Sequence, residues 1–247
     1  MKQTRLLWDM PITVEIVDAW AKEKDISEIF QYFEEIDKTF SVFREDSEIS
    51  QINKNLLPKE KYSQEMTEVL FLCEKTKNES NGYFEISRDG KLDPTGLVKG
   101  FALYQASKAL KVKGFQNYYL DAGGDIEVSG KNLKGKLWVV GIRNPFNRNE
   151  NIKAVTLKDK GIATSGTYIR GQHIYNLHNL QQITDLVSLT VIAPNVYEAD
   201  RFATAAFAMG KAGIEFIASR KELEGYAVDP KGLATFTQGF SQYLLKQ

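Results

Sequence analysis

The feature that most constrains the fold is the order in which helical and strand-like hydrophobic patterns follow one another. Residues 22–40 repeat apolar side chains every three or four positions, which predicts an amphipathic helix. Residues 7–17 instead alternate and are rich in β-branched side chains, which predicts a strand. Along the chain the two patterns succeed each other without a regular βαβα alternation. The sequence therefore predicts an α+β fold, and a length of 247 residues fits one large domain or two small ones.

The remaining segments continue this mixture, with no internal repeat and no low-complexity linker. Capping residues support two more helices: Asp46 and Ser47 could cap a short one, and Ser63 is the predicted N-cap of a helix over residues 63–79. Further helices are predicted from the LDPTGLVKGFAL stretch to about Lys111, over residues 198–210, and over KAGIEFIASRK. Strands are predicted in SNGYFEIS, on both sides of the Gly-Gly turn in NYYLDAGGDIEVSG, in KLWVVGIRNP, AVTLKDKGIATSG and SLTVIAP, and as a hairpin in YAVDPKGLATFTQGF.

Charge and cysteine content exclude several classes of protein. Lys+Arg and Asp+Glu both total 32, so no global basic field points to nucleic acid. Cys73 is the only cysteine, which excludes an intrachain disulfide and a thiolate metal cluster, and its apolar neighbours predict a buried helical position. No apolar run reaches the roughly 18 residues of a membrane span, and the N-terminus does not resemble a signal peptide. As written the chain is expected to be cytoplasmic. An exported protein from which the leader has been removed is the alternative.

The stretch LDPTGLVKGFAL places an acid, a glycine and a lysine at the mouth of a helix. Gly96 lets a ligand approach the backbone closely, and the N–H groups at a helix start form an anion site. Lys99 could pair with a phosphate, and Asp93 could accept from a ribose hydroxyl or an amine. The alternative is an ordinary turn with a solvated lysine, and the residues alone leave both interpretations open.

Asp200 and Thr204 are four residues apart on the predicted helix at 198–210, so their oxygens lie on one face. A carboxylate and a hydroxyl suit a hard cation such as Mg²⁺. The alternative is that Asp200 complements the helix dipole while Thr204 packs in the core.

Two other segments are made of small and polar residues, and the two histidines are further candidates for a functional site. The AGGD turn at 122–125 and ATSGTY at 163–168 could both approach a ligand closely. His173 and His178 are five apart, which is not the spacing of a helical zinc pair, although one of them could accept a proton. We expect His178 to be a surface histidine without a role. Because GxGxxG and GxxxxGK[ST] are absent, ordinary dinucleotide and nucleotide-phosphate loops are not predicted.

Taken in order, these segments resemble the FAD:protein FMN transferase (ApbE-type) family. The likeness runs from about residue 8 to 240 and rests on SVFREDSEISQIN, SNGYFEIS, LDPTGLVKGFAL, LDAGGDIEVSG, WVVGIRNP, GIATSGTYIR, HIYN and EADRFATAAFAMG. The resemblance implies a single domain over residues 1–247, with an α+β fold that has a core related to the T-fold and mixed or antiparallel sheets flanked by helices. It also implies Mg²⁺-dependent transfer of FMN from FAD onto a threonine or serine hydroxyl of a target flavoprotein, with release of AMP. FAD hydrolysis to FMN and AMP, or FAD binding without catalysis, are the alternatives.

The resemblance also implies roles for individual residues. The metal ligands would be Asp200, Thr204 and the backbone carbonyl of Gly96, and the reaction would use Lys99, Asp200 and, as base for the acceptor hydroxyl, His173. The residues that would contact FAD are Met10, Ser41, Phe43, Glu85, Ile86, Ser87, Asp93, Lys99, Ile174 and Ala203.

Two segments depart from the family pattern. The family usually continues P-x-T-G after HIYN, whereas this chain has Leu177, His178, Asn179 and Leu180. Where the family often has D[IV]T, this chain has Glu85-Ile86-Ser87. The first change bears on acceptor binding or turnover and the second on the adenine or ribose contacts, while neither touches the implied metal ligands.

Overall fold

The computed structural model describes residues 1–147, 149–167 and 175–246. Within these ranges eight strands form one sheet in the order β1-β2-β5-β6-β9-β12-β13-β14, and every neighbouring pair in it is antiparallel. The sheet strands are β1 (Lys2–Leu7), β2 (Met10–Ile16), β5 (Tyr118–Ala122), β6 (Asp125–Ser129), β9 (Lys160–Gly166), β12 (Ser188–Ala193), β13 (Glu224–Val228) and β14 (Ala234–Phe236).

Three two-stranded hairpins accompany this sheet in the described part of the chain: β3–β4 (Ser87–Arg88, Lys91–Leu92), β7–β8 (Trp138–Arg143, Asn151–Leu157) and β10–β11 (Tyr175–Asn176, Gln181–Gln182). The helices are α1 (Glu23–Phe40), α2 (Glu48–Asn53), α3 (Gln64–Glu79), α4 (Thr95–Val112), α6 (Val196–Ala208) and α7 (Ala212–Ala218), with 3₁₀ turns η1 (Lys59–Lys61) and η2 (Gln238–Tyr243).

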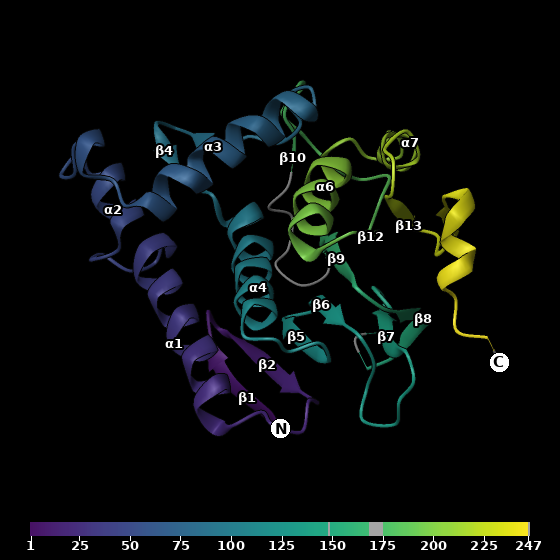
Figure 1. Ribbon diagram of the computed structural model, residues 1–247. Helices are drawn as coiled ribbons and strands as arrows, with labels where there is room; N and C mark the ends of the chain where they lie inside the picture. Colours follow the sequence, from purple (N-terminus) through teal and green to yellow (C-terminus); the bar gives the residue numbers. More distant parts are fainter. Residues whose placement is uncertain (148, 168–174, 247) are drawn as a thin grey trace.

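The main helices and the β7–β8 hairpin cover different parts of the sheet (Figure 1). The apolar face of α1 packs with β2 and β5 in one hydrophobic cluster, together with α3 and α4. A second cluster joins α6 and α7 to β9, β12 and β13. A third cluster packs β7, β8 and η2 against other residues of β6, β9, β12 and β13. Strand β12 is buried along its whole length because it supplies side chains to both the second and the third cluster.

The long periodic segments fold as the sequence predicts. Helix α1 begins and ends within the predicted range, Ser47 and Ser63 accept backbone N–H bonds as N-caps of α2 and α3, and Cys73 is buried. The RDGK turn and the DPKG hairpin also form.

Two predicted strands differ from what the structure shows. The predicted strand at 7–17 is divided by Trp8 and Asp9, which adopt positive φ and turn the chain back, so that β1 pairs with β2. Residues 80–86 form no strand, and the strand in this region is Ser87–Arg88.

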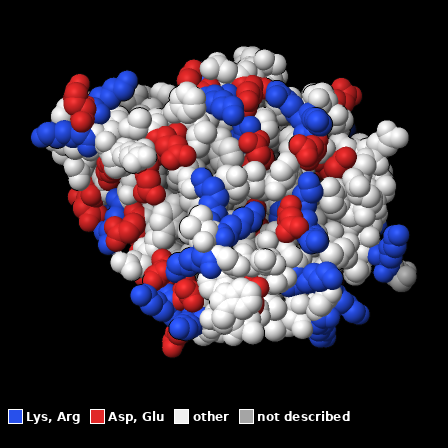
Figure 2. Space-filling model, in the orientation of Figure 1, with Lys and Arg blue, Asp and Glu red and all other residues white. Residues whose placement is uncertain are grey.

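None of the helices in the described ranges is long and apolar enough to span a membrane. Figure 2 shows basic and acidic side chains interspersed over the face that it presents.

Candidate active site

Helix α4 begins at the DPTG turn. The Asp93 carboxylate accepts a hydrogen bond from the Thr95 N–H (Oδ1 to N, 3.0 Å), while Pro94 occupies the N-cap position. Asp93 also anchors the neighbouring segment, because its N–H donates to the Ile86 carbonyl at 2.8 Å. Gly96 and Gly100 follow one turn apart, on the part of α4 that faces α6.

Helices α4 and α6 touch through Gly100 and Asp200. The Gly100 N–H donates to Asp200 Oδ2 at 2.8 Å, across 100 residues of sequence. A Cβ at Gly100 would lie 2.7 Å from Asp200 Cβ and 2.9 Å from the Val196 carbonyl oxygen, so only glycine fits here. The Gly96 carbonyl, to which the Gly100 N–H points in a regular helix, also accepts a hydrogen bond from Thr204 Oγ1 at 3.2 Å.

Asp200 lies in an environment that disfavours its charge. It is 6% exposed, and burial raises the pKa of its carboxyl well above the ordinary value, with the charge of Asp125 acting in the same direction. The charge of Lys99 and the Gly100 N–H act in the opposite direction. Because Asp200 lies in the second turn of α6 and is buried, complementing the helix dipole does not describe its position.

Asp125 completes this group of charges, and sequence reasoning missed it. Its Oδ2 lies 2.5 Å from Nζ of Lys99, and its Oδ1 accepts a 3.3 Å bond from the Thr164 N–H. Only 2% of Asp125 is exposed, so its ion pair with Lys99 lies in a place from which water is largely excluded. The AGGD motif carried a signal for it, because Asp125 directly follows the two glycines at which the backbone can approach a ligand closely.

The oxygen atoms around Thr204 form the donor set that could hold a cation. Ser165 Oγ of the predicted ATSGTY segment lies 3.4 Å from Thr204 Oγ1, which in turn meets the Gly96 carbonyl. A carboxylate, a hydroxyl and a carbonyl fit Mg²⁺, and a bound cation would stabilise the charged form of Asp200 that burial and Asp125 disfavour. In the described ranges there is no group of three or more His, Cys, Asp and Glu side chains that could hold a metal, so any cation site here depends on this mixed set.

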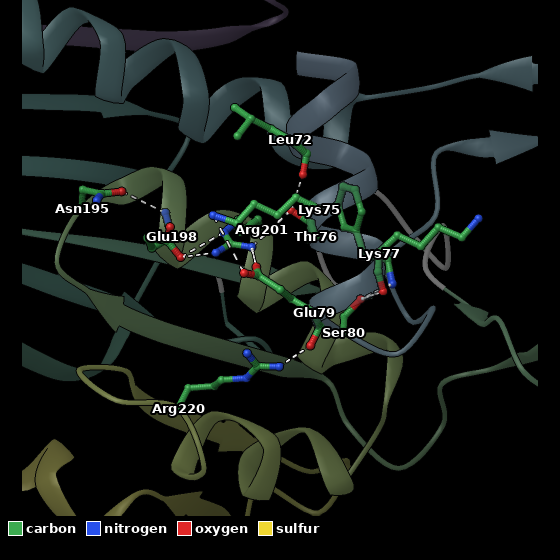
Figure 3. A network of polar contacts seen from close by, with 11 residues as sticks. Leu72, Lys75, Thr76, Lys77, Glu79, Ser80, Asn195, Glu198, Arg201 and Arg220 are labelled. Atoms are coloured by element: carbon green, nitrogen blue, oxygen red, sulfur yellow. Dashed lines mark hydrogen bonds and ion pairs between the residues drawn. The ribbon is translucent and has the colours of Figure 1, made fainter. Parts of the chain in front are cut away.

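Arg201, the residue after Asp200, joins α6 to α3 through hydrogen bonds and ion pairs (Figure 3). Its guanidinium pairs with Glu79 of α3 and with Glu198, whose Oε2 lies 2.9 Å from Nε. Arg220 donates to the Glu79 carbonyl, which ties the chain after α7 to the same point. The Arg201 side chain is buried while both carboxylates stay partly exposed, and the ion pair with Glu79 joins α6 to α3.

A pocket of about 370 Å³ lies beside this site and contains three of the predicted FAD contacts. Leu70, Cys73, Ile86 and Leu92 supply an apolar lining, and the polar residues are Glu74, Lys77, Glu85 and Ser87. Glu85 is held within the pocket, since its Oε2 lies 2.5 Å from Lys77 Nζ and its Oε1 accepts from the Ser87 N–H at 2.8 Å. A larger pocket of about 470 Å³ lies at the far end of β5 and β6 and contains none of the predicted site residues.

The other predicted FAD contacts in the described ranges lie on separate elements, outside the lining of this pocket. Met10 packs against the AGGD turn, since its Sδ lies 2.8 Å from where a Cβ of Gly123 would be. Ala203 is buried on α6 beside Thr204. Ser41 follows α1, where its carbonyl accepts from Ser47, and Phe43 is 88% exposed. His173 and Ile174 lie outside the described residues.

The family model described as "ApbE family" matches residues 8–90 and 86–227, which together are most of the chain. The chain belongs to the ApbE family. The family match and the antiparallel α+β architecture confirm the fold class that the sequence predicts.

Relatives named FAD:protein FMN transferase match part of this ApbE chain. The protein from Haemophilus influenzae is 30% identical over 56% of this chain, and that from Klebsiella pneumoniae is 28% identical over 63%. The matched segments span 43% and 46% of those two relatives, so the chain spans less than half of the length of the curated relatives it matches.

Solved structures match over nearly the whole chain. "Flavin Transferase ApbE from Vibrio cholerae" superimposes with a TM-score of 0.85 at 19% identity, and each chain covers 99% of the other. The ApbE protein from Thermotoga maritima gives 0.86 at 21% identity, over 100% of this chain and 99% of its own. At these identities the likeness concerns the fold.

Proposed function

We propose that this protein is a Mg²⁺-dependent flavin transferase that moves FMN from FAD onto a threonine or serine hydroxyl of an acceptor flavoprotein and releases AMP. The observation that carries the proposal is the convergence of Gly96, Asp200 and Thr204 from two helices that are a hundred residues apart in sequence. The names of the relatives from Haemophilus influenzae and Klebsiella pneumoniae support the same activity.

The chain's own residues would bind the dinucleotide at two places. The pocket at Glu85, Ile86 and Ser87 has the apolar lining and polar edge that an adenine ring needs. The start of α4 would take the phosphates, because the Lys99 ammonium offers positive charge there. Asp125 would hold Lys99 in place through its ion pair.

Gly96, Asp200 and Thr204 would hold Mg²⁺, which supplies charge neutralisation for the phosphate oxygens when it is bound. The raised pKa of Asp200 fits such a role, because a buried carboxylate beside a second one is stabilised by a nearby cation.

The transfer itself exchanges one phosphorus–oxygen bond for another. The acceptor hydroxyl oxygen bonds to the phosphorus on the FMN side, the bond from that phosphorus to the bridging oxygen breaks, and AMP leaves with that oxygen. A hydroxyl needs a base within hydrogen-bond reach, and His173 is the residue that the family resemblance offers to take its proton.

The test uses FAD, Mg²⁺ and a small flavoprotein domain that bears an acceptor threonine. Mass spectrometry should find the domain heavier by one FMN, with an equal amount of AMP released, and the same domain with valine at that threonine should stay unmodified. Free FMN and AMP without attachment would make the protein an FAD hydrolase, with water in place of the acceptor hydroxyl. FAD that survives intact would contradict the proposed function.

A further inference from the structure

The β10–β11 hairpin is too small to hold its own position. Each strand has two residues, and Leu177, His178, Asn179 and Leu180 form the loop. Local hydrogen bonds shape it: the Leu180 N–H donates to the Asn176 carbonyl at 2.7 Å, and the His178 N–H donates to Asn176 Oδ1 at 3.0 Å. An isolated two-stranded hairpin is marginally stable at best in water. Contacts with other parts of the protein must therefore fix where it lies.

His178 makes the contact that docks the hairpin. Its ring lies against the Tyr83 ring, with centroids 4.3 Å apart, and its Nε2 lies 2.9 Å from the Asn81 carbonyl oxygen. At the other end of the hairpin the Arg88 guanidinium stacks on the Tyr175 ring at 5.0 Å. Both contacts join the hairpin to the segment between α3 and β4, more than eighty residues away in sequence.

The loop that receives His178 is held by its own backbone. The Gly82 N–H donates to the Lys77 carbonyl at 2.8 Å, and the Phe84 N–H donates to Ser80 Oγ at 3.0 Å. Asn81 and Gly82 both adopt positive φ, the conformation that ends a helix tightly. His178 therefore docks a weakly held hairpin onto a firmly held loop.

This loop leads directly into the candidate site. Phe84, the residue after Tyr83, is 3% exposed and packs at Gly96, where a Cβ would lie 3.5 Å from its ring. The next three residues, 85–87, contribute to the 370 Å³ pocket. On the other side of the contact, Tyr175 directly follows in sequence the segment that carries His173 and Ile174.

We propose that His178 is a positioning residue, which fixes the hairpin after the predicted base against the loop before the predicted adenine pocket. The role of the docked hairpin in FMN transfer rests on the proposed function, whereas the docking itself does not. His178 thus supplies a fixed position for a loop in which this chain lacks the P-x-T-G of its family. The sequence-based expectation that His178 has no role is replaced by this inference.

Hydrogen exchange tests the docking without any activity measurement. In H178A the amides of residues 175–182, Leu180 above all, should exchange about tenfold faster, because an aromatic contact and a hydrogen bond are lost together. Y83A removes the ring contact and leaves the Asn81 carbonyl in place, so it should give a smaller increase, and the double variant should exchange no faster than H178A. Q182A is the matched control, since Gln182 is an exposed residue of the same hairpin, and it should leave exchange unchanged, as should amides of β12 in all variants.

Kinetics tests the positioning. H178A should lower kcat for FMN transfer about tenfold while KM for FAD stays within about twofold, because the adenine pocket is built by other residues. H178F keeps the ring contact and H178Q keeps a donor for Asn81, so each should recover part of the lost rate.

Unchanged exchange in H178A would overturn the docking, and faster exchange with unchanged kcat would overturn the positioning. If the unaltered protein neither binds FAD nor transfers FMN, the proposed function fails. The exchange comparison would then still decide whether His178 holds the hairpin.

Discussion

At the scale of single residues, the candidate site depends on carboxylates that the fold buries. Asp200 and Asp125 share one lysine in a place from which water is largely excluded. Asp200 and Thr204 could be singled out from the sequence because i, i+4 spacing fixes their common face. Asp125 could not be paired with Lys99 from the sequence, because no local rule relates the end of a Gly-Gly turn to a helix that precedes it. The pairing arises only when β6 and α4 pack together.

Asp200→Asn tests the metal assignment at this scale. Asparagine keeps the size of the side chain and an oxygen for the Gly100 N–H, but it removes the charge that a cation needs. The thermal stabilisation that Mg²⁺ gives the unaltered protein should disappear, while stability without Mg²⁺ should be kept or increased, because a buried carboxylate beside Asp125 is lost. Calorimetric scans with and without Mg²⁺ measure both quantities. Glu215→Gln on the exposed side of α7 is the control, and a full Mg²⁺ shift in the Asp200 variant would show that the metal assignment is wrong.

The buried carboxyl of Glu127 should make the free energy of unfolding depend on pH. Burial raises the pKa of its carboxyl to about 7, although the Val196 N–H, 2.6 Å from Oε2, acts to lower it. A carboxyl whose pKa is raised by folding stabilises the fold below its unfolded pKa, and this contribution is lost as the pH rises through about 7. Relative to Glu127→Gln, the unaltered protein should lose on the order of 3 kcal/mol between pH 4.5 and pH 8. Urea unfolding of both proteins across this range checks it, and parallel curves would contradict the assignment.

At the scale of elements, the site exists because α4 and α6 approach closely at glycine. The sequence predicted both helices, since each is long and strongly patterned. It did not predict β1 as a separate strand, the β10–β11 hairpin or η2. These segments are short, and what holds them is contact with distant parts of the chain, such as Tyr83 for the hairpin and the third hydrophobic cluster for η2.

Gly100→Ala tests the close approach of the two helices. An added methyl group would overlap Asp200 Cβ and the Val196 carbonyl, so α4 and α6 would have to separate. We expect a loss of about 1–3 kcal/mol in the free energy of unfolding, although alanine favours a helix over glycine by about 1 kcal/mol. Ala109→Gly at an exposed position of α4 measures that preference alone. Urea denaturation gives both values, and a Gly100 variant that gains stability would contradict the packing.

At the scale of the whole molecule, the three hydrophobic clusters share elements. Helix α6 contributes to the first and second clusters, and β12 contributes to the second and third. Each cluster shares at least one helix or strand with another cluster. We therefore expect residues 1–247 to unfold as one unit. Trp8 packs against the first cluster and Trp138 lies in the third, so the fluorescence of both reports on different parts. Urea midpoints from tryptophan fluorescence and far-ultraviolet circular dichroism should coincide, and two separate transitions would argue for two domains.

We propose that α4 and α6 together bind a divalent cation that the FAD phosphates require. Isothermal titration of FAD, with and without Mg²⁺, in the unaltered protein and in Asp200→Asn measures this requirement. Mg²⁺ should tighten FAD binding at least about tenfold in the unaltered protein, in line with one charge-assisted contact, and should have no effect in the variant. Equal FAD affinity with and without Mg²⁺ in the unaltered protein would contradict it.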